Sequence, residues 1–247
     1  MARAAVQRRL TWQVATVDDL VDETARVKTI VLDVPDWPGH RAGQHLDIRL
    51  TAEDGYRAER EYSIAAAPGE PVAITVERLE DGEVSPYLTE ELREGDGLEL
   101  RGPIGGHFVW GPENGGPLLL IAGGSGVVPL RAMLRHRKRT GNDLPVRLLY
   151  SCRSLDDVIY RDELDAASDG IEVIYTLTRE QPPGWTGHAR RVDADLLNEV
   201  AWPSDENARA FVCGPTSFVE TVADGLVELG YPPVRVKTER FGATGLK

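Results

Sequence analysis

The feature that most constrains the fold of this chain is a regular alternation of apolar runs and helical segments in residues 118–241. The runs are short and almost wholly apolar, which is typical of strands buried on both faces of a parallel sheet. The segments between them have the spacing of helices that cover such a sheet. We therefore predict a parallel α/β unit with strands at 118–123, 146–152, 171–177, 208–214 and 234–241 and helices at 129–139, 160–168, 193–200 and 215–229.

Residues 11–110 have a different period. Short strand-like segments follow one another, separated by turn residues such as Pro68, Gly69 and Glu70, which is the spacing of an antiparallel barrel or sandwich. The expected strands lie at 11–19, 25–34, 44–51, 60–67, 71–79 and 97–105. Because a stretch rich in glycine and proline separates the two halves, we predict two domains, 1–112 and 113–247.

One segment of the first half, residues 85–96, breaks the strand pattern. Ser85 is a favourable helix cap, Pro86 suits a first helical turn, and Leu88 with Leu92 forms an apolar stripe. We predict that this segment is a single helix covering one end of the barrel.

Composition excludes several classes of function. The 28 basic and 40 acidic residues give a net charge of −12, which repels a phosphate backbone, so we expect no nucleic-acid partner. Two cysteines, Cys152 and Cys213, are too few for a thiolate iron-sulfur cluster or a cysteine zinc site, and we expect no metal. The basic first residues lack the apolar segment of an export signal, and no run reaches the ~18 apolar residues of a membrane helix. We expect a cytoplasmic protein without a membrane segment.

The turn after the strand at 118–123 has the composition of a nucleotide loop. Gly124 and Gly126 stand where a G-x-G-x-x-G loop has its first two glycines, but Pro129 takes the place of the third. We predict that Pro129 starts the following helix and that both glycines let a pyrophosphate approach the backbone. Taken alone, the stretch fits a tight strand-to-helix turn without a ligand equally well.

Five motifs in order, "REYS" (60–63), "DGEVSPYL" (81–88), "GGSGVVP" (123–129), "FVCGPTSF" (211–218) and "ERFG" (239–242), together resemble the ferredoxin-NADP reductase superfamily of flavoproteins. The resemblance runs from about residue 11 to residue 242 and is to the compact form without an iron-sulfur domain. It implies a β + α/β fold, in which an N-terminal antiparallel Greek-key β-barrel binds FAD and a parallel, Rossmann-like α/β domain binds NAD(P).

The resemblance also implies a flavin site on the barrel. Arg60 matches the arginine that pairs with the FAD pyrophosphate, Tyr62 the aromatic against the isoalloxazine, and Ser63 the hydroxyl near its N5 atom. Without the other motifs, Arg60 and Tyr62 would be taken for a surface charge and a half-buried strand residue. The remaining positions matched to the FAD site are Glu61, Val76, Glu77, Arg78, Gly82, Val84, Ser85 and Phe241.

In the second half the resemblance implies a nicotinamide site. Cys213 would lie near the nicotinamide edge as a small spacer. A buried cysteine at the end of a strand, without any ligand, would have the same sequence pattern. Arg153, Arg179 and Arg190 match places where bacterial members hold the 2′-phosphate, which favours NADPH and leaves NADH open. Exposed arginines are also common without a ligand. The positions matched to the pyrophosphate loop and the second signature are Gly124, Ser125, Gly126, Pro129, Gly214 and Pro215.

The implied activity is a hydride transfer from NADPH to FAD, followed by electron delivery to a separate redox protein: a ferredoxin, a flavodoxin, an oxygenase or another oxidoreductase. Ser63, Cys213 and Glu239 would shape the hydride-transfer site. Three alternatives remain open: a reductase of free flavin, an electron-transfer subunit of a larger complex, and a nucleotide sensor without redox turnover.

Overall fold

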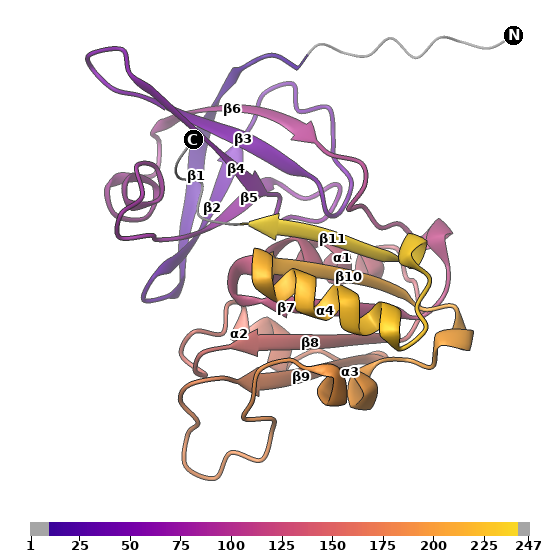
Figure 1. The fold of residues 1–247 in the computed structure, drawn as a ribbon. Helices are drawn as coiled ribbons and strands as arrows, with labels where there is room; N and C mark the ends of the chain where they lie inside the picture. Colours follow the sequence, from indigo (N-terminus) through magenta and orange to yellow (C-terminus); the bar gives the residue numbers. More distant parts are fainter. Residues whose placement is uncertain (1–9, 242–247) are drawn as a thin grey trace, which may run out of the picture.

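The computed structural model describes residues 10–241, which form two sheets packed against each other (Figure 1). The start of the first predicted domain and the end of the second therefore lie outside the described residues. The expectation that the first residues form no export signal also lies outside them. Within it, the boundary at 112/113 falls in the connection between the two sheets and stays a prediction.

The first sheet is an antiparallel barrel, as predicted. Its strands are β1 (Gln13–Thr24), β2 (Val27–Asp33), β3 (His45–Thr51), β4 (Arg57–Ser63), β5 (Val72–Glu77) and β6 (Gly97–Ile104). Their order is β4-β3-β6-β1-β2-β5, and a bridge between Ile64 and Ile74 joins the two end strands. Alternate residues such as Leu46, Ile48 and Leu100 are fully buried and fill the interior.

The helix predicted at 85–96 begins at Ser85 as expected but ends at Glu91 in the structure. Ser85 and Pro86 are α-helical, and Tyr87–Glu91 continues as a turn of π type. Ser85 does not cap this turn, because its hydroxyl instead accepts a hydrogen bond of 3.1 Å from the amide of Leu79. Leu88 and Leu92 are buried, so the apolar stripe does cover the barrel.

The second sheet is parallel, with strand order β11-β10-β7-β8-β9. This confirms the predicted α/β unit and its strands. The strands are β7 (Leu118–Gly123), β8 (Val146–Cys152), β9 (Ile171–Leu177), β10 (Arg209–Pro215) and β11 (Val236–Phe241). The helices are α1 (Val127–Arg139), α2 (Arg161–Asp165), α3 (Ala194–Val200) and α4 (Thr216–Glu228), of which α2 is shorter than predicted.

The helices cover both faces of this sheet, and one face also meets the barrel. Buried side chains of α1 and α2, such as Met133 and Leu164, belong to one apolar core with the barrel residues. A second core joins α3 and α4 to the opposite face. In Figure 1, α4 accordingly lies in front of the sheet and α1 behind it. Phe108 of the first half packs against Phe211 of the second, with ring centroids 5.4 Å apart, and this contact helps to hold the two halves together.

Within residues 10–241, no helix combines the length and the apolar character that crossing a bilayer requires.

Candidate active site

The predicted flavin residues lie where the two end strands of the barrel separate. Beyond the bridge between Ile64 and Ile74, the described residues form no further ladder between β4 and β5. Arg60, Tyr62 and Ser63 lie near the end of β4. Val76 and Glu77 end β5, and Arg78 follows directly. The unpaired strand edges leave backbone groups free to hydrogen-bond a bound molecule.

Arg60 is held in this opening by an acidic neighbour. Its guanidinium donates a 2.8 Å hydrogen bond to a carboxylate oxygen of Glu83, in the "DGEVS" loop, and a second to the carbonyl of Glu59. Burial raises the pKa of Tyr62 well above its ordinary value, although the nearby Arg60 acts in the opposite direction. Tyr62 is therefore a neutral phenol beside a cation, a pairing suited to a flat ring carrying a phosphate tail.

The loop after β5 brings Arg78, Gly82 and Ser85 to the same region. Arg78 pairs with Glu90 and Glu80, but its Nε atom is buried and has no partner among the described residues. Gly82 leaves no room for a side chain, since a Cβ there would come within 2.8 Å of the Ser85 hydroxyl. The tight loop by itself therefore explains why position 82 is a glycine. The unpartnered Nε atom of Arg78, in contrast, is a donor that a ligand could use.

The three residues predicted to shape hydride transfer are drawn together from three strands. Ser63 pairs with His45 across β4 and β3, and Nδ1 of His45 lies 3.8 Å from Oε1 of Glu239. Glu239 on β11 is in turn the register partner of Cys213 on β10. The end of the parallel sheet thereby meets the end of the barrel strand (Figure 1).

Burial controls the charge of this group. The Glu239 carboxyl has its pKa raised to about 7, first by burial and second by the negative charge of Glu61. Its Oε2 atom is buried without a partner among the described residues. Burial, together with Glu239, raises the pKa of Cys213 well above its ordinary value, so this thiol is neutral and unsuited to attack as a nucleophile.

The nucleotide loop differs from the prediction at the start of its helix. Helix α1 begins at Val127, after a 3₁₀ turn over Gly124–Gly126, so Pro129 is its third residue and does not start it. Proline is tolerated there because the first amides of a helix have no intrahelical partner. Gly126 is packed, not open: a Cβ would overlap the carbonyl oxygen of Cys213. Gly124 alone faces open space, with a φ of +55°.

The three predicted phosphate-binding arginines are not equivalent. Arg153 and Arg179 follow β8 and β9 and are joined by a 2.9 Å hydrogen bond from the amide of Arg179 to the carbonyl of Arg153. Both side chains are exposed. Arg190 already forms two hydrogen bonds to the carboxylate of Asp193, the residue that caps α3. Arg153 and Arg179 are thus backbone neighbours at the carboxyl ends of β8 and β9, and neither forms an ion pair with another described residue.

Sequence reasoning missed His45. A single histidine in a barrel strand carries no local signal, and its partner Glu239 is distant in the sequence. His45 also lies with Asp47 and Glu61 in a group whose ligand atoms are within 4.8 Å of one another. Arg101 donates two hydrogen bonds to Asp47, at 2.9 and 2.5 Å, so part of this charge is already balanced.

Comparison with known proteins agrees with this arrangement. Two family models match the chain: an oxidoreductase FAD-binding domain over residues 15–110 and an oxidoreductase NAD-binding domain over residues 120–224. The chain is 39% identical to a ferredoxin-NADP reductase B of Sorangium cellulosum, over 81% of this chain and 84% of that protein. It is 32% identical to the ferredoxin reductase component of a 3-ketosteroid-9-alpha-monooxygenase of Rhodococcus rhodochrous, over 93% of this chain and 65% of that protein.

Among solved structures, the FAD/NAD-binding domain of a nitric oxide dioxygenase from Vibrio cholerae superposes with a TM-score of 0.81 at 27% identity, over 93% of this chain and 98% of that one. A flavin-binding barrel joined to a nucleotide-binding α/β domain defines a two-domain flavoprotein oxidoreductase. The chain belongs to the ferredoxin-NADP reductase superfamily, whose cofactors are FAD and a nicotinamide nucleotide.

Proposed function

We propose that this chain is a cytoplasmic reductase that oxidises NADPH through FAD and delivers the electrons to a separate redox protein. Its two units would be domains 1–112 and 113–247. The observation that carries the proposal is the meeting of the barrel and the parallel sheet at one point, where His45, beside Ser63, lies 3.8 Å from Glu239, beside Cys213.

When bound, FAD supplies the redox chemistry, because it accepts a hydride and releases single electrons. The chain's own residues bind and orient. Arg60 and Arg78 provide donors for the pyrophosphate, Tyr62 an aromatic face, and Ser63 a hydroxyl beside the reacting edge. Cys213 is a small neutral side chain that leaves space for a nicotinamide.

Glu239 can hold a proton at this point. A carboxyl with a pKa near 7 is populated in both protonation states at neutral pH. Its Oε1 atom lies 3.8 Å from Nδ1 of His45, which is too long for a hydrogen bond, so the carboxyl itself is the group that holds the proton. This carboxyl would exchange the proton that accompanies flavin reduction and reoxidation.

The acceptor is proposed to be a protein. The relatives described above are a ferredoxin-NADP reductase and the reductase component of an oxygenase. The present sequence has two cysteines, both buried and unbridged, which cannot form a four-thiolate cluster. The proposed acceptor is a ferredoxin, a flavodoxin, an oxygenase or another oxidoreductase.

The test is an anaerobic titration of the purified FAD-loaded protein with NADPH and, separately, with NADH. We expect the flavin absorption to bleach with both nucleotides and at lower concentration with NADPH. No bleaching with either would indicate a nucleotide sensor and end the proposal. Loss of FAD during desalting would instead identify a reductase of free flavin.

A further inference from the structure

Tyr160 lies at the junction of the two domains in an uncommon backbone conformation. Its φ of 61° and ψ of 32° place it in the left-handed region, which non-glycine residues rarely occupy. The side chain is only 4% exposed. Its surroundings therefore hold a bulky residue in a conformation that it would not adopt alone.

The hydroxyl of Tyr160 begins a chain of hydrogen bonds that crosses into the barrel. It donates to Oγ1 of Thr75 on β5, which lies 2.8 Å from Oγ1 of Thr29 on β2. Thr29 donates a 2.6 Å hydrogen bond to Glu23 on β1. Because burial raises the pKa of Tyr160 well above its ordinary value, the hydroxyl stays protonated and remains the donor. One side chain of the second domain is thus connected to three barrel strands.

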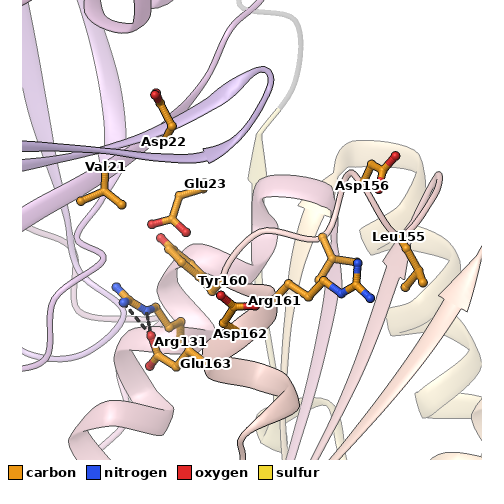
Figure 2. A pocket seen from close by; sticks show the side chains of 11 residues that line it. Val21, Asp22, Glu23, Arg131, Leu155, Asp156, Tyr160, Arg161, Asp162 and Glu163 are labelled. Atoms are coloured by element: carbon orange, nitrogen blue, oxygen red, sulfur yellow. Dashed lines mark hydrogen bonds and ion pairs between the residues drawn. The ribbon is translucent and has the colours of Figure 1, made fainter.

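The ring of Tyr160 is fixed from the other side by Arg131 on α1. The guanidinium carbon lies 4.1 Å from the ring centroid, and the same group pairs with Glu163 at 2.6 Å. Figure 2 shows the Tyr160 side chain above this pair and directed toward the hairpin that carries Glu23, in the wall of a cavity of about 490 Å³.

Arg131 connects the same point to both predicted cofactor sites. Its helix follows the nucleotide loop at Gly124–Gly126 directly, and its guanidinium donates a 3.4 Å hydrogen bond to the carbonyl of Ala65. Ala65 is two residues beyond Ser63 in the chain. The nucleotide loop and Ser63 are thus both connected, through short stretches of chain, to Arg131.

The other polar contacts across this junction are more exposed. Arg135 reaches Glu70 at 3.0 Å, but its side chain is 36% exposed, and ion pairs in water contribute little. Removal of the Tyr160 hydroxyl would instead leave the Thr75 and Thr29 hydroxyls buried with one partner fewer. The tyrosine bridge is therefore the stronger restraint.

We propose that Tyr160 is a positioning residue, which fixes the nucleotide loop relative to Ser63 and so sets the approach of nicotinamide to flavin. This proposal rests on the proposed function above. The residue acts through Thr75 and Arg131 and touches neither predicted cofactor position. Since misplacement of reacting groups by about 1 Å can cost about 100-fold in rate, loss of one bridging hydroxyl should be visible in the transfer step.

The test compares Tyr160→Phe with Tyr175→Phe in FAD-loaded protein. The control removes an equivalent tyrosine hydroxyl, which donates to Asp165 within the second domain and makes no bond to the barrel. In anaerobic stopped-flow experiments, Tyr160→Phe should lower the limiting rate of flavin reduction about tenfold, with FAD content and the Kd for NADPH unchanged. Tyr175→Phe should match the wild type.

Hydrogen exchange provides a readout that does not depend on activity. In both FAD-free and FAD-loaded protein, Tyr160→Phe should accelerate amide exchange in β5 and in residues 158–164 together, whereas Tyr175→Phe should not affect β5. Equal rates and equal exchange in the two variants would overturn the proposal. If the wild type itself showed no flavin reduction, the proposed function would fail, and the exchange result would still decide whether the bridge holds the domains.

A second pair of variants covers the case in which Tyr160→Phe does not fold. Thr75→Ser keeps the accepting hydroxyl and should retain the wild-type rate and exchange. Thr75→Val removes it and should reproduce the tenfold loss. Identical behaviour of these two variants would overturn the proposal.

Discussion

Nδ1 of His45 lies 3.8 Å from Oε1 of Glu239, which joins the third strand of the barrel to the last strand of the parallel sheet. The carboxyl at this joint is mostly removed from water, and its second oxygen has no partner among the described residues. The charge of Glu239 is therefore set by its environment and is measurable through its effect on stability.

The first prediction concerns the pH dependence of stability. The folded protein holds the Glu239 proton up to a pKa of about 7, whereas the ordinary value is 4.5. Folding therefore gains most from this group below pH 4.5, and the gain is lost as the pH rises to about 7. Glu239→Gln should remove this loss, on the order of 2 kcal/mol in the free energy of unfolding between pH 5 and 8. Urea unfolding of the FAD-free proteins measures the difference.

Glu61 supplies the control for this prediction. Because its negative charge is the second cause of the raised pKa, Glu61→Gln should lower the pKa of Glu239 and reduce the same pH dependence without abolishing it. Parallel stability profiles for the wild type and Glu239→Gln would contradict the assignment.

The second prediction concerns coenzyme selection. Arg153→Ala and Arg179→Ala should each weaken NADP⁺ binding by about 10 to 150-fold, because each would remove the charge-assisted bond of about 1.5 to 3 kcal/mol that we propose to the 2′-phosphate. NAD⁺, which lacks that phosphate, should bind each variant almost as it binds the wild type. Difference spectra of the bound flavin measure both dissociation constants.

Arg190→Ala is the matched comparison, since Arg190 is already bound to Asp193. It should weaken NADP⁺ binding less than the other two. An equal loss of NADP⁺ and NAD⁺ affinity in Arg179→Ala would show that the arginine acts on folding of the loop and not on the phosphate.

The third prediction separates the two glycines of the nucleotide loop. In Gly126→Ala, the new methyl group would meet the backbone carbonyl of Cys213, which cannot move aside as a side chain can. We expect the free energy of unfolding to fall by about 1 to 3 kcal/mol, as in other overpacked sites. Thermal unfolding of the FAD-loaded protein measures the change.

Gly124→Ala should affect nucleotide binding, whereas Gly126→Ala should affect folding. Its Cβ would enter open space at a positive φ, so the folding cost is a local backbone strain of about 1 to 2 kcal/mol. The methyl group would, however, stand where a pyrophosphate approaches the backbone, and NADP⁺ affinity should fall about tenfold. Unchanged NADP⁺ affinity would place the pyrophosphate elsewhere.

The fold could be predicted from the sequence because the two halves have different hydrophobic periods. Buried runs such as Leu118–Gly123 read as parallel strands whatever surrounds them. The helix expected at 85–96 starts at Ser85 but ends early, at Glu91. Residues 93–96 form a turn instead, because the Asp96 carboxylate accepts a hydrogen bond from the amide of Arg93 and the amide of Gly95 bonds the carbonyl of Val17 on β1. Helix propensity describes a local preference, and these competing contacts override it.

The site could be predicted only in part. The motif residues do reach one region, but His45 and Tyr160 owe their positions to partners far along the chain and carry no local pattern. The glycines show the same limit. Gly124 and Gly126 look alike in sequence, and the backbone of Cys213, on another strand, decides which of them is open.

The last prediction concerns FAD affinity and the ion pair between Arg60 and Glu83. A pyrophosphate bound to Arg60 must compete with the Glu83 carboxylate, which lies 2.8 Å from the guanidinium. Exposed pairs of this kind are worth up to about 1 kcal/mol, so Glu83→Gln should tighten FAD binding by up to about fivefold. Arg60→Ala should weaken it by about 10 to 150-fold, since the charge-assisted bond itself is lost. Quenching of FAD fluorescence on titration into FAD-free protein measures both.

Arg57→Ala is the control, because Arg57 is an exposed arginine on the same strand with no predicted flavin contact. Arg57→Ala should weaken FAD binding only slightly, through the loss of one positive charge, and added salt should remove this effect. The loss of FAD affinity in Arg60→Ala should persist in added salt, because salt screens exposed charges more than charges in direct contact. If Glu83→Gln weakened FAD binding, the carboxylate would be orienting the arginine for its ligand. The pair would then be part of the binding site and not a competitor for it.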